Sequence, residues 1–260
     1  MHYVDTHCHL DYSSYNHDIE EVISRAVDQG VTRILVPGLH LESSRSAIRL
    51  AERFEEVYAA VGVHPGDIES YHPDQFTEFK NLLNHKKVVA VGEIGLDYYH
   101  RQDNIPLQKK LLDLFLDLAI QHDKPVILHS RNCLKDLIDI ITQKKTVDPG
   151  NQLRGVFHAF EGNLNEAQYI TKIGFYLGAG GPVTYKNAAI KQEVFSKIEL
   201  SHILLETDGP FLSPQKHRGQ RNEPAWIPFI AQKIADLRQC DIKVIADATT
   251  NNARDLFNWT

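Results

Sequence analysis

The sequence predicts an α/β protein of the (β/α)8 TIM-barrel class, formed by a single domain over residues 1–260, and three observations lead to this prediction. Eight short apolar runs alternate with helical patterns, and successive runs end roughly 30 residues apart, the length of one βα unit. The runs are continuous rather than alternating in polarity, as in parallel strands that helices cover on both faces. The chain has 260 residues, and barrels of this class have about 250. An open doubly wound sheet is the alternative, but no glycine-rich dinucleotide motif follows the first run.

The predicted strands share a β-branched or apolar core that ends near a polar or turn-forming residue. They cover residues 3–7, 33–37, 57–63, 88–93, 125–129, 155–158, 175–178 and 203–206.

The predicted helices lie between these strands and are bounded by residues that begin or end helices. Asp18 is expected to cap a helix that begins at residue 19, and Gly30 is expected to end it. Further helical patterns begin after a proline or end before a glycine, and the tail is expected to form two or three helices. These patterns cover residues 74–84, 107–121, 164–173 and 223–257.

The composition of the chain restricts its cellular compartment and the classes of partner that it binds. The formal net charge is −6 and the pI is near 6.1, so no overall basic face for gripping duplex DNA is expected. No apolar run approaches the roughly 20 residues of a membrane helix, and no signal peptide is apparent. The three cysteines, Cys8, Cys133 and Cys240, are far apart, which is typical of the reducing cytoplasm. We therefore expect a cytoplasmic protein with no membrane contact and no obligate protein partner.

The first predicted strand ends in two histidines one residue apart, His7 and His9. Side chains alternate faces along a strand, so these imidazoles project the same way and form half of a metal site. The alternative is a pair of surface histidines at an exposed strand tip.

Other predicted strands also end in imidazole or carboxylate groups. Each alone has a simpler explanation, such as a hydrogen-bonded histidine, a carboxylate that caps amides, or a turn aspartate. As a set they would meet at the carboxyl-end mouth of a barrel, where burying them without cations would cost several kcal/mol each. A metal centre avoids that cost, and its predicted ligands are His7, His9, Glu93, His129, His158 and Asp208.

Seven sequence motifs together resemble the TatD family of metal-dependent deoxyribonucleases, and they extend over residues 5–257. The resemblance implies a TIM barrel with two divalent ions. Mg²⁺, Zn²⁺ and Mn²⁺ are the alternatives for these ions. The resemblance implies that His7, His9, Glu93 and Asp208 hold one ion, and that Glu93 bridges to a second ion held with His129 and His158. The motifs are Asp5-Thr6-His7-Cys8-His9, Gly62-Val63-His64-Pro65, Gly92-Glu93-Ile94-Gly95-Leu96-Asp97, Leu128-His129-Ser130-Arg131, Leu205-Glu206-Thr207-Asp208, His217-Arg218-Gly219-Gln220-Arg221-Asn222-Glu223-Pro224 and Thr250-Asn251-Asn252-Ala253-Arg254-Asp255-Leu256-Phe257.

The chain departs from the pattern of that family at two positions. Glu161 and Pro182 stand where small hydroxyl residues are expected. Both changes bear on substrate preference more than on chemistry.

Three residues are predicted to be catalytic. Asp208 is the candidate general base, and Glu93 acts beside it as a ligand. His64 is expected to contact a substrate phosphate or to polarise the scissile bond; the alternative is that it fixes the turn before Pro65. Asp97 is expected to orient a ligating histidine.

The predicted function is hydrolysis of phosphodiester bonds in DNA, from single-stranded ends. The alternatives are hydrolysis of a small ester, lactone, phosphotriester or amide at the same site, and a non-catalytic binding protein with a degenerate metal site. Basic residues near the mouth are the expected contacts to phosphate. Beside His64, they are Arg131, His217, Arg218 and Arg221.

Overall fold

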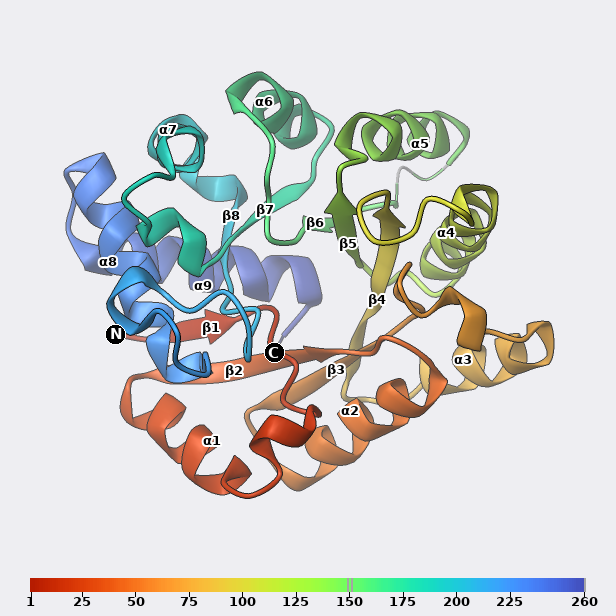
Figure 1. Ribbon diagram of the computed structural model, residues 1–260, viewed down its shortest axis with the longest axis horizontal. Helices are drawn as coiled ribbons and strands as arrows, with labels where there is room; N and C mark the ends of the chain where they lie inside the picture. Colours follow the sequence, from red (N-terminus) through yellow and green to blue (C-terminus); the bar gives the residue numbers. More distant parts are fainter. Residues whose placement is uncertain (149, 151, 260) are drawn as a thin grey trace. The chain divides into compact units, whose positions relative to one another are not determined.

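The computed structural model describes residues 1–148, 150 and 152–259, and in this part of the chain eight strands form one sheet in sequence order (Figure 1). Helices alternate with these strands, and the paired strands run parallel. The predicted (β/α)8 fold class is therefore confirmed. The strands are β1 (Tyr3–Asp5), β2 (Val31–Pro37), β3 (Val57–Val61), β4 (Val88–Asp97), β5 (Val126–Arg131), β6 (Gly155–Phe157), β7 (Tyr176–Ala179) and β8 (Ile203–Leu205).

Nine α-helices lie in the described part of the chain, and those with predicted bounds begin or end within a few residues of them. The two tail helices were expected, as were the patterns after Pro73 and Pro106. The helices are α1 (Ile19–Asp28), α2 (Leu41–Arg53), α3 (Phe76–Leu82), α4 (Ile105–Gln121), α5 (Leu134–Val147), α6 (Leu164–Lys172), α7 (Ala189–Lys197), α8 (Ile227–Arg238) and α9 (Ile242–Phe257).

Short 3₁₀ turns join several of these elements, mostly in the connections that follow strands. They are η1 (Ser13–Tyr15), η2 (Ile68–Ser70), η3 (Pro73–Gln75), η4 (Gly181–Thr184), η5 (Leu200–His202), η6 (Gln215–His217) and η7 (Pro224–Trp226).

The ends of α1 show one prediction confirmed and one wrong. Gly30 follows the helix with φ of 83°, a left-handed conformation that costs glycine little, so it ends α1 as expected. Asp18 precedes the helix, but its side chain makes no capping hydrogen bond. Instead, both oxygens of the Asp18 carboxylate accept hydrogen bonds from the guanidinium of Arg221, so the carboxylate does not cap the helix amides.

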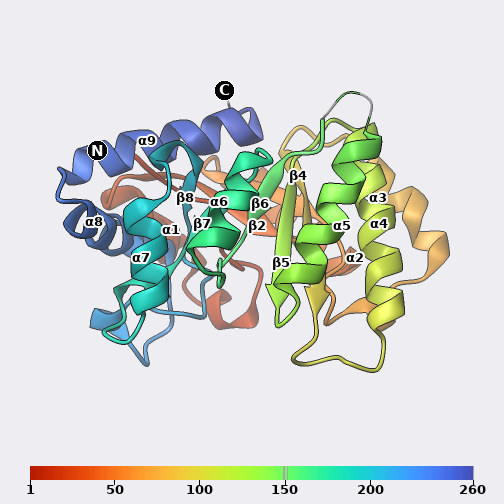
Figure 2. The same ribbon diagram turned by 90° about the horizontal axis from the view of Figure 1, so that it is seen from above.

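Two compact units make up the chain, residues 37–158 and residues 1–36 with 159–260. That residues 1–260 form a single domain stays a prediction. In the 37–158 unit, α4 and α5 lie alongside β4 and β5 (Figures 1 and 2). All ten residues of β4 are buried, which explains its continuous apolar sequence.

In the other unit, the first strand lies beside the last. The Thr6 amide donates a hydrogen bond to the Leu205 carbonyl oxygen at 3.0 Å, directly beyond β1. Helices α8 and α9 pack on both β1 and β8 (Figure 1). Contact between the first and last strands is what closure of a barrel requires.

Two further expectations concern cysteines and membranes. Cys8, Cys133 and Cys240 are all free thiols, as their spacing predicted. Among the described residues, every helix is too short or too polar to cross a bilayer.

We predict that Phe115→Ala lowers the free energy of unfolding by about 3–5 kcal/mol. Phe115 on α4 is fully buried and lies edge-to-face with Phe79 at 5.1 Å between ring centroids. Leu107→Ala is the control, because Leu107 lies on the same helix but is exposed, and its truncation should cost less than about 0.5 kcal/mol. Urea unfolding measures both values, and similar losses for the two variants would contradict this account of the core.

Candidate metal centre

The first cluster of metal-binding side chains lies at the ends of β1 and β8. The Nε2 atoms of His7 and His9 are 3.2 Å apart. The Oδ1 atom of Asp208 lies 3.7 Å from His7 Nε2 and 3.5 Å from His9 Nε2. At such distances, the two imidazole nitrogens and the carboxylate oxygen can act as three ligands of one divalent ion. This donor set suits Zn²⁺ or Mn²⁺.

Backbone hydrogen bonds hold the two segments of this cluster together. The Asp208 amide donates to the His7 carbonyl oxygen at 2.8 Å, and the His9 amide donates to that of Gly209 at 2.7 Å. Asp208 has φ of 58°, a left-handed conformation that aspartate tolerates better than most residues. The ligands are therefore positioned by main-chain pairing and not by their side chains alone.

A buried carboxylate beneath the cluster fixes the same segments. Asp5 is fully buried and accepts hydrogen bonds from the Thr207 amide at 2.9 Å and from the His7 amide at 3.2 Å. Burial raises the pKa of the Asp5 carboxyl to about 7, although the hydrogen bonds from Thr207 and His7 act in the opposite direction. Asp5 lies in the first motif but was not predicted to have a role.

The second cluster takes Glu93 from within β4, His129 from within β5 and His158 from directly beyond β6. One oxygen of Glu93, Oε1, lies 2.7 Å from His129 Nδ1 and 3.1 Å from His158 Nε2. Glu93 is only 2% exposed, so its charge depends on these neighbours. Together with His64, Glu93 and His129 have ligand atoms within 4.8 Å of one another, which is a donor set that fits a divalent ion.

Close packing of β4 against β5 sets the position of His129. Gly95 has φ of 151°, and a Cβ atom there would overlap the carbonyl oxygen of His129. Glycine is therefore required where the two strands approach each other.

His64 lies beside this second cluster, and with Glu93 and His129 it forms a group that could hold a metal ion. Its Nδ1 accepts a hydrogen bond from the Gly66 amide at 3.0 Å, so the neutral ring carries its proton on Nε2. That Nε2–H group lies 3.6 Å from Glu93 Oε1. In this tautomer Nε2 donates a hydrogen bond and does not bind a metal. That His64 acts on the substrate stays a prediction.

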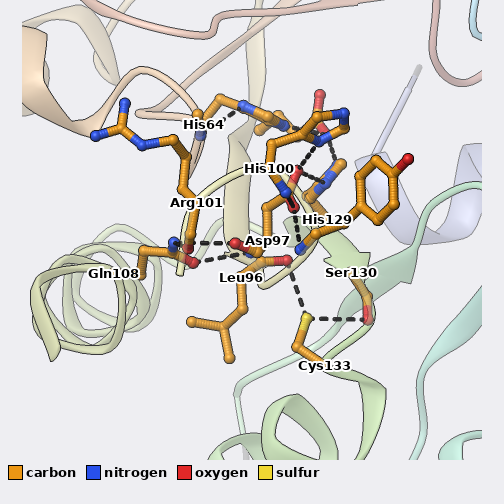
Figure 3. A network of polar contacts seen from close by, with 12 residues as sticks. His64, Leu96, Asp97, His100, Arg101, Gln108, His129, Ser130 and Cys133 are labelled. Atoms are coloured by element: carbon orange, nitrogen blue, oxygen red, sulfur yellow. Dashed lines mark hydrogen bonds and ion pairs between the residues drawn. The ribbon is translucent and has the colours of Figure 1, made fainter. Parts of the chain in front are cut away.

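Asp97 lies behind His129, at the end of β4 (Figure 3). Its Oδ2 atom is 3.6 Å from His129 Nε2 and 2.7 Å from Nδ1 of the exposed His100. Burial alone would raise the pKa of this carboxyl, but the nearby imidazole of His129 and the hydrogen bonds from His100 outweigh burial and lower the pKa. Asp97 is thus kept ionised, where it can orient the imidazole of His129 as expected.

Gln108 on α4 holds Asp97 in place, and the sequence analysis missed it. Its Oε1 accepts from the Asp97 amide at 2.8 Å, and its Nε2 donates to the carbonyl oxygens of Asp97 and Arg101 at 3.0 and 2.8 Å (Figure 3). Gln108 is fully buried. No signal in the local sequence indicates that this glutamine, two residues after Pro106, reaches Asp97.

The four basic residues predicted to bind phosphate have partners within the chain. Arg221 pairs with Asp18 through both carboxylate oxygens, at 2.8 and 2.6 Å, which offsets its charge. The guanidinium groups of Arg131 and Arg218 lie over the rings of Tyr99 and Tyr185, at 5.3 and 4.8 Å. His217 stacks on Trp226 at 4.2 Å between ring centroids. Phosphate binding by these residues stays a prediction.

Known proteins are similar to this chain in both sequence and fold. A family model described as "TatD related DNase" matches residues 4–258. The uncharacterized metal-dependent hydrolase YabD of Bacillus subtilis (strain 168) is 38% identical over 253 residues, which cover 97% of this chain and 98% of that protein. The corresponding hydrolase YjjV of Escherichia coli (strain K12) is 36% identical over 258 residues, 98% of each chain.

Solved structures agree with these matches. The crystal structure of YjjV, described as a TatD homolog, superposes with a TM-score of 0.92 at 35% identity and covers 99% of this chain and 98% of that chain. A TatD-family hydrolase from Entamoeba histolytica superposes with a TM-score of 0.86 at 23% identity, covering 99% and 98%, and shows the same fold.

A (β/α)8 fold with clustered histidine and carboxylate ligands at its strand ends defines a metal-dependent hydrolase. The chain belongs to the TatD family, as its motifs indicated.

We predict that Asp97→Asn weakens divalent-ion binding at the second cluster about 10- to 100-fold, because the amide no longer holds His129 through a charge. Asp113→Asn on α4 is the control, since Asp113 forms an exposed ion pair with Lys144. Calorimetric titration of the metal-free protein with Zn²⁺ measures both affinities. Equal affinities in the wild type and Asp97→Asn would show that Asp97 does not position a ligand.

We also predict that divalent ions stabilise the folded chain, because the ligands converge only when it is folded. At an ion concentration 100 times Kd, the gain is about 2.7 kcal/mol, or several degrees in Tm. Differential scanning calorimetry with Mn²⁺, Zn²⁺ or Mg²⁺, against chelator and a KCl control, measures the shift. Tm values that stay the same with all three ions and with chelator would refute a metal centre.

Proposed function

We propose that the chain hydrolyses phosphodiester bonds in DNA, starting from single-stranded ends, and that each of the two clusters holds one divalent ion. The family model carries the description of a DNase, which supports this substrate. The free thiols support a cytoplasmic location, because disulfides are rare in that reducing compartment.

The observation that carries the proposal is the pairing of each buried carboxylate with two imidazoles. Asp208 lies with His7 and His9, and Glu93 lies with His129 and His158. In this proposal, His7, His9 and Asp208 hold one ion, and Glu93, His129 and His158 hold the other. Bound divalent ions supply Lewis acidity, which makes water acidic near neutral pH and offsets negative charge on a phosphate group.

Two side chains of this protein handle protons and charge during the proposed reaction. An Asp208 carboxylate oxygen takes the proton of the attacking water, as a general base must lie next to the group it deprotonates. His64 donates its Nε2–H to a phosphate oxygen, a role for which the Gly66 hydrogen bond sets the tautomer.

Local basic residues attract the proposed substrate, because the whole chain carries a net charge of −6. Arg131, Arg218 and His217 are the proposed phosphate contacts. Arg131 directly follows the His129-Ser130 pair on β5, which places it near a proposed ligand. Arg221 contributes less in this proposal, since Asp18 offsets its charge.

A substrate panel tests this proposal with the purified, ion-loaded protein. We expect cleavage of single-stranded oligonucleotides with free ends, and slower cleavage when the 3′ end is blocked. A phosphotriester and a lactone are assayed in parallel. Hydrolysis of either small molecule without cleavage of any nucleic acid would refute the DNA assignment and favour a small-molecule hydrolase.

We predict that Asp208→Asn and Glu93→Gln each lower kcat at least about 100-fold, because each removes a charge that general-base or metal-assisted hydrolysis needs. Circular dichroism should show that both variants remain folded. Asp247→Asn is the control, since Asp247 forms an exposed pair with Lys243 on α9 and should keep wild-type kcat. Near-wild-type turnover in either active-site variant would contradict the assigned roles.

A further inference from the structure

A cavity of about 210 Å³ opens beside Asp208, and it is lined by residues 159–161 and by residues at and beyond the ends of β7 and β8. The cavity wall is mostly apolar and includes Phe160, Val183, Phe195 and Leu212. It is not accounted for by ion binding, which uses small, polar sites. Its place next to a proposed ligand means that a group bound to the ion could extend directly into it.

Two glycines on β7 and just beyond it shape this cavity. A Cβ atom at Gly178 would overlap the carboxylate of Glu206, so the glycine makes room for that side chain. At Gly180, an added Cβ would come no closer than 3.6 Å to a neighbour, the Cδ of Pro182. Since Gly180 lines the cavity and has φ of −103°, alanine fits there and only reduces the open space.

The charged residues around the cavity exclude phosphate and favour an uncharged group. Asp208, Glu206 and Glu161 contribute three carboxyl groups, against one ammonium from Lys191. The Lys191 Nζ atom donates to the Phe160 carbonyl oxygen at 2.6 Å. A phosphodiester is therefore repelled from the cavity but attracted by a cation at Asp208.

Aromatic side chains give the cavity a surface suited to a planar ring. Phe160, Phe195 and Tyr185 all line it. Tyr185 is fixed by a hydrogen bond from its hydroxyl to the Ser213 carbonyl oxygen at 3.0 Å and by the Arg218 guanidinium over its ring. Stacking of a base on such side chains contributes about 1–3 kcal/mol.

We propose that this cavity binds one nucleobase of the substrate, the base whose nucleotide places its phosphate at Asp208. The inference rests on the proposed function and adds a base-recognition site to it. Carboxylates accept hydrogen bonds and repel carbonyl oxygens, so the cavity favours bases with amino groups (adenine, cytosine and guanine) over thymine. Glu161 and Pro182, where the chain departs from the expected motif, both line the cavity and adjust this preference.

Free deoxynucleosides test the cavity without requiring any hydrolysis. Metal-free wild-type protein is titrated with deoxyadenosine, deoxycytidine, deoxyguanosine and thymidine, with 2-deoxyribose as the ligand control, and binding is followed by saturation-transfer NMR. We expect the three amino-bearing nucleosides to bind, thymidine to bind most weakly and the sugar not to bind. Gly180→Ala should weaken nucleoside binding about tenfold by filling the space of the ring. Ala189→Ser is the matched control, because residue 189 is exposed and lies outside the cavity.

Abasic oligonucleotides connect the cavity to cleavage. One base at a time is removed from a single-stranded substrate, and we expect one position to lower kcat/KM about tenfold for the wild type. For Gly180→Ala this abasic effect should largely disappear, because the base is already excluded.

Each failure has its own meaning. Absence of nucleoside binding, or equal binding by the wild type and Gly180→Ala, would overturn the cavity proposal even if DNA is cleaved. Nucleoside binding that Gly180→Ala weakens supports base recognition by the cavity, and absence of DNA cleavage in that case would overturn only the proposed function.

Discussion

The burial of two carboxylates, Glu93 and Asp208, is the constraint on which the arrangement of polar side chains in this protein depends. Glu93 is 2% exposed, and the Asp208 side chain is 13% exposed. An ionised group in such surroundings costs several kcal/mol unless opposite charge or hydrogen-bond donors compensate it. The histidines gather around these two groups for this reason, and the same arrangement makes the protein a metal-dependent hydrolase.

A second layer of hydrogen bonds keeps the imidazoles in place, and it differs between the two clusters. Asp5 and Thr207 tie the first cluster together through the main chain, while Asp97 and Gln108 hold His129 from behind. Main-chain pairing positions His7 and His9 at one strand end, and the ring of His9 also stacks on Tyr12. His129 stands on a strand that passes closely over Gly95, so a side-chain network is needed to fix its ring.

The fold class could be predicted because its signal is local and repeated. Continuous apolar runs such as β4 encode strands buried on both faces, and every predicted strand was found with shifts of a few residues. That histidine and carboxylate side chains cluster could be predicted because each directly follows such a run. The partners of side chains in loops were not predictable. Pairing of Asp18 with Arg221 joins residues 203 positions apart, and nothing in the local sequence indicates it. The same holds for Gln108 and for the cavity, which depends on how three connections pack.

The contact between β1 and β8 has a consequence for how the protein matures. Thr6 and Leu205 are 199 positions apart, and the first cluster takes His7 and His9 from one end of the chain and Asp208 from the other. During synthesis, the growing polypeptide therefore exposes a histidine pair long before the carboxylate that completes it has left the ribosome. An ion held by these three side chains would be captured only after Asp208 has been synthesised, and it would link distant parts of the chain and offset the entropy of closing a very long loop.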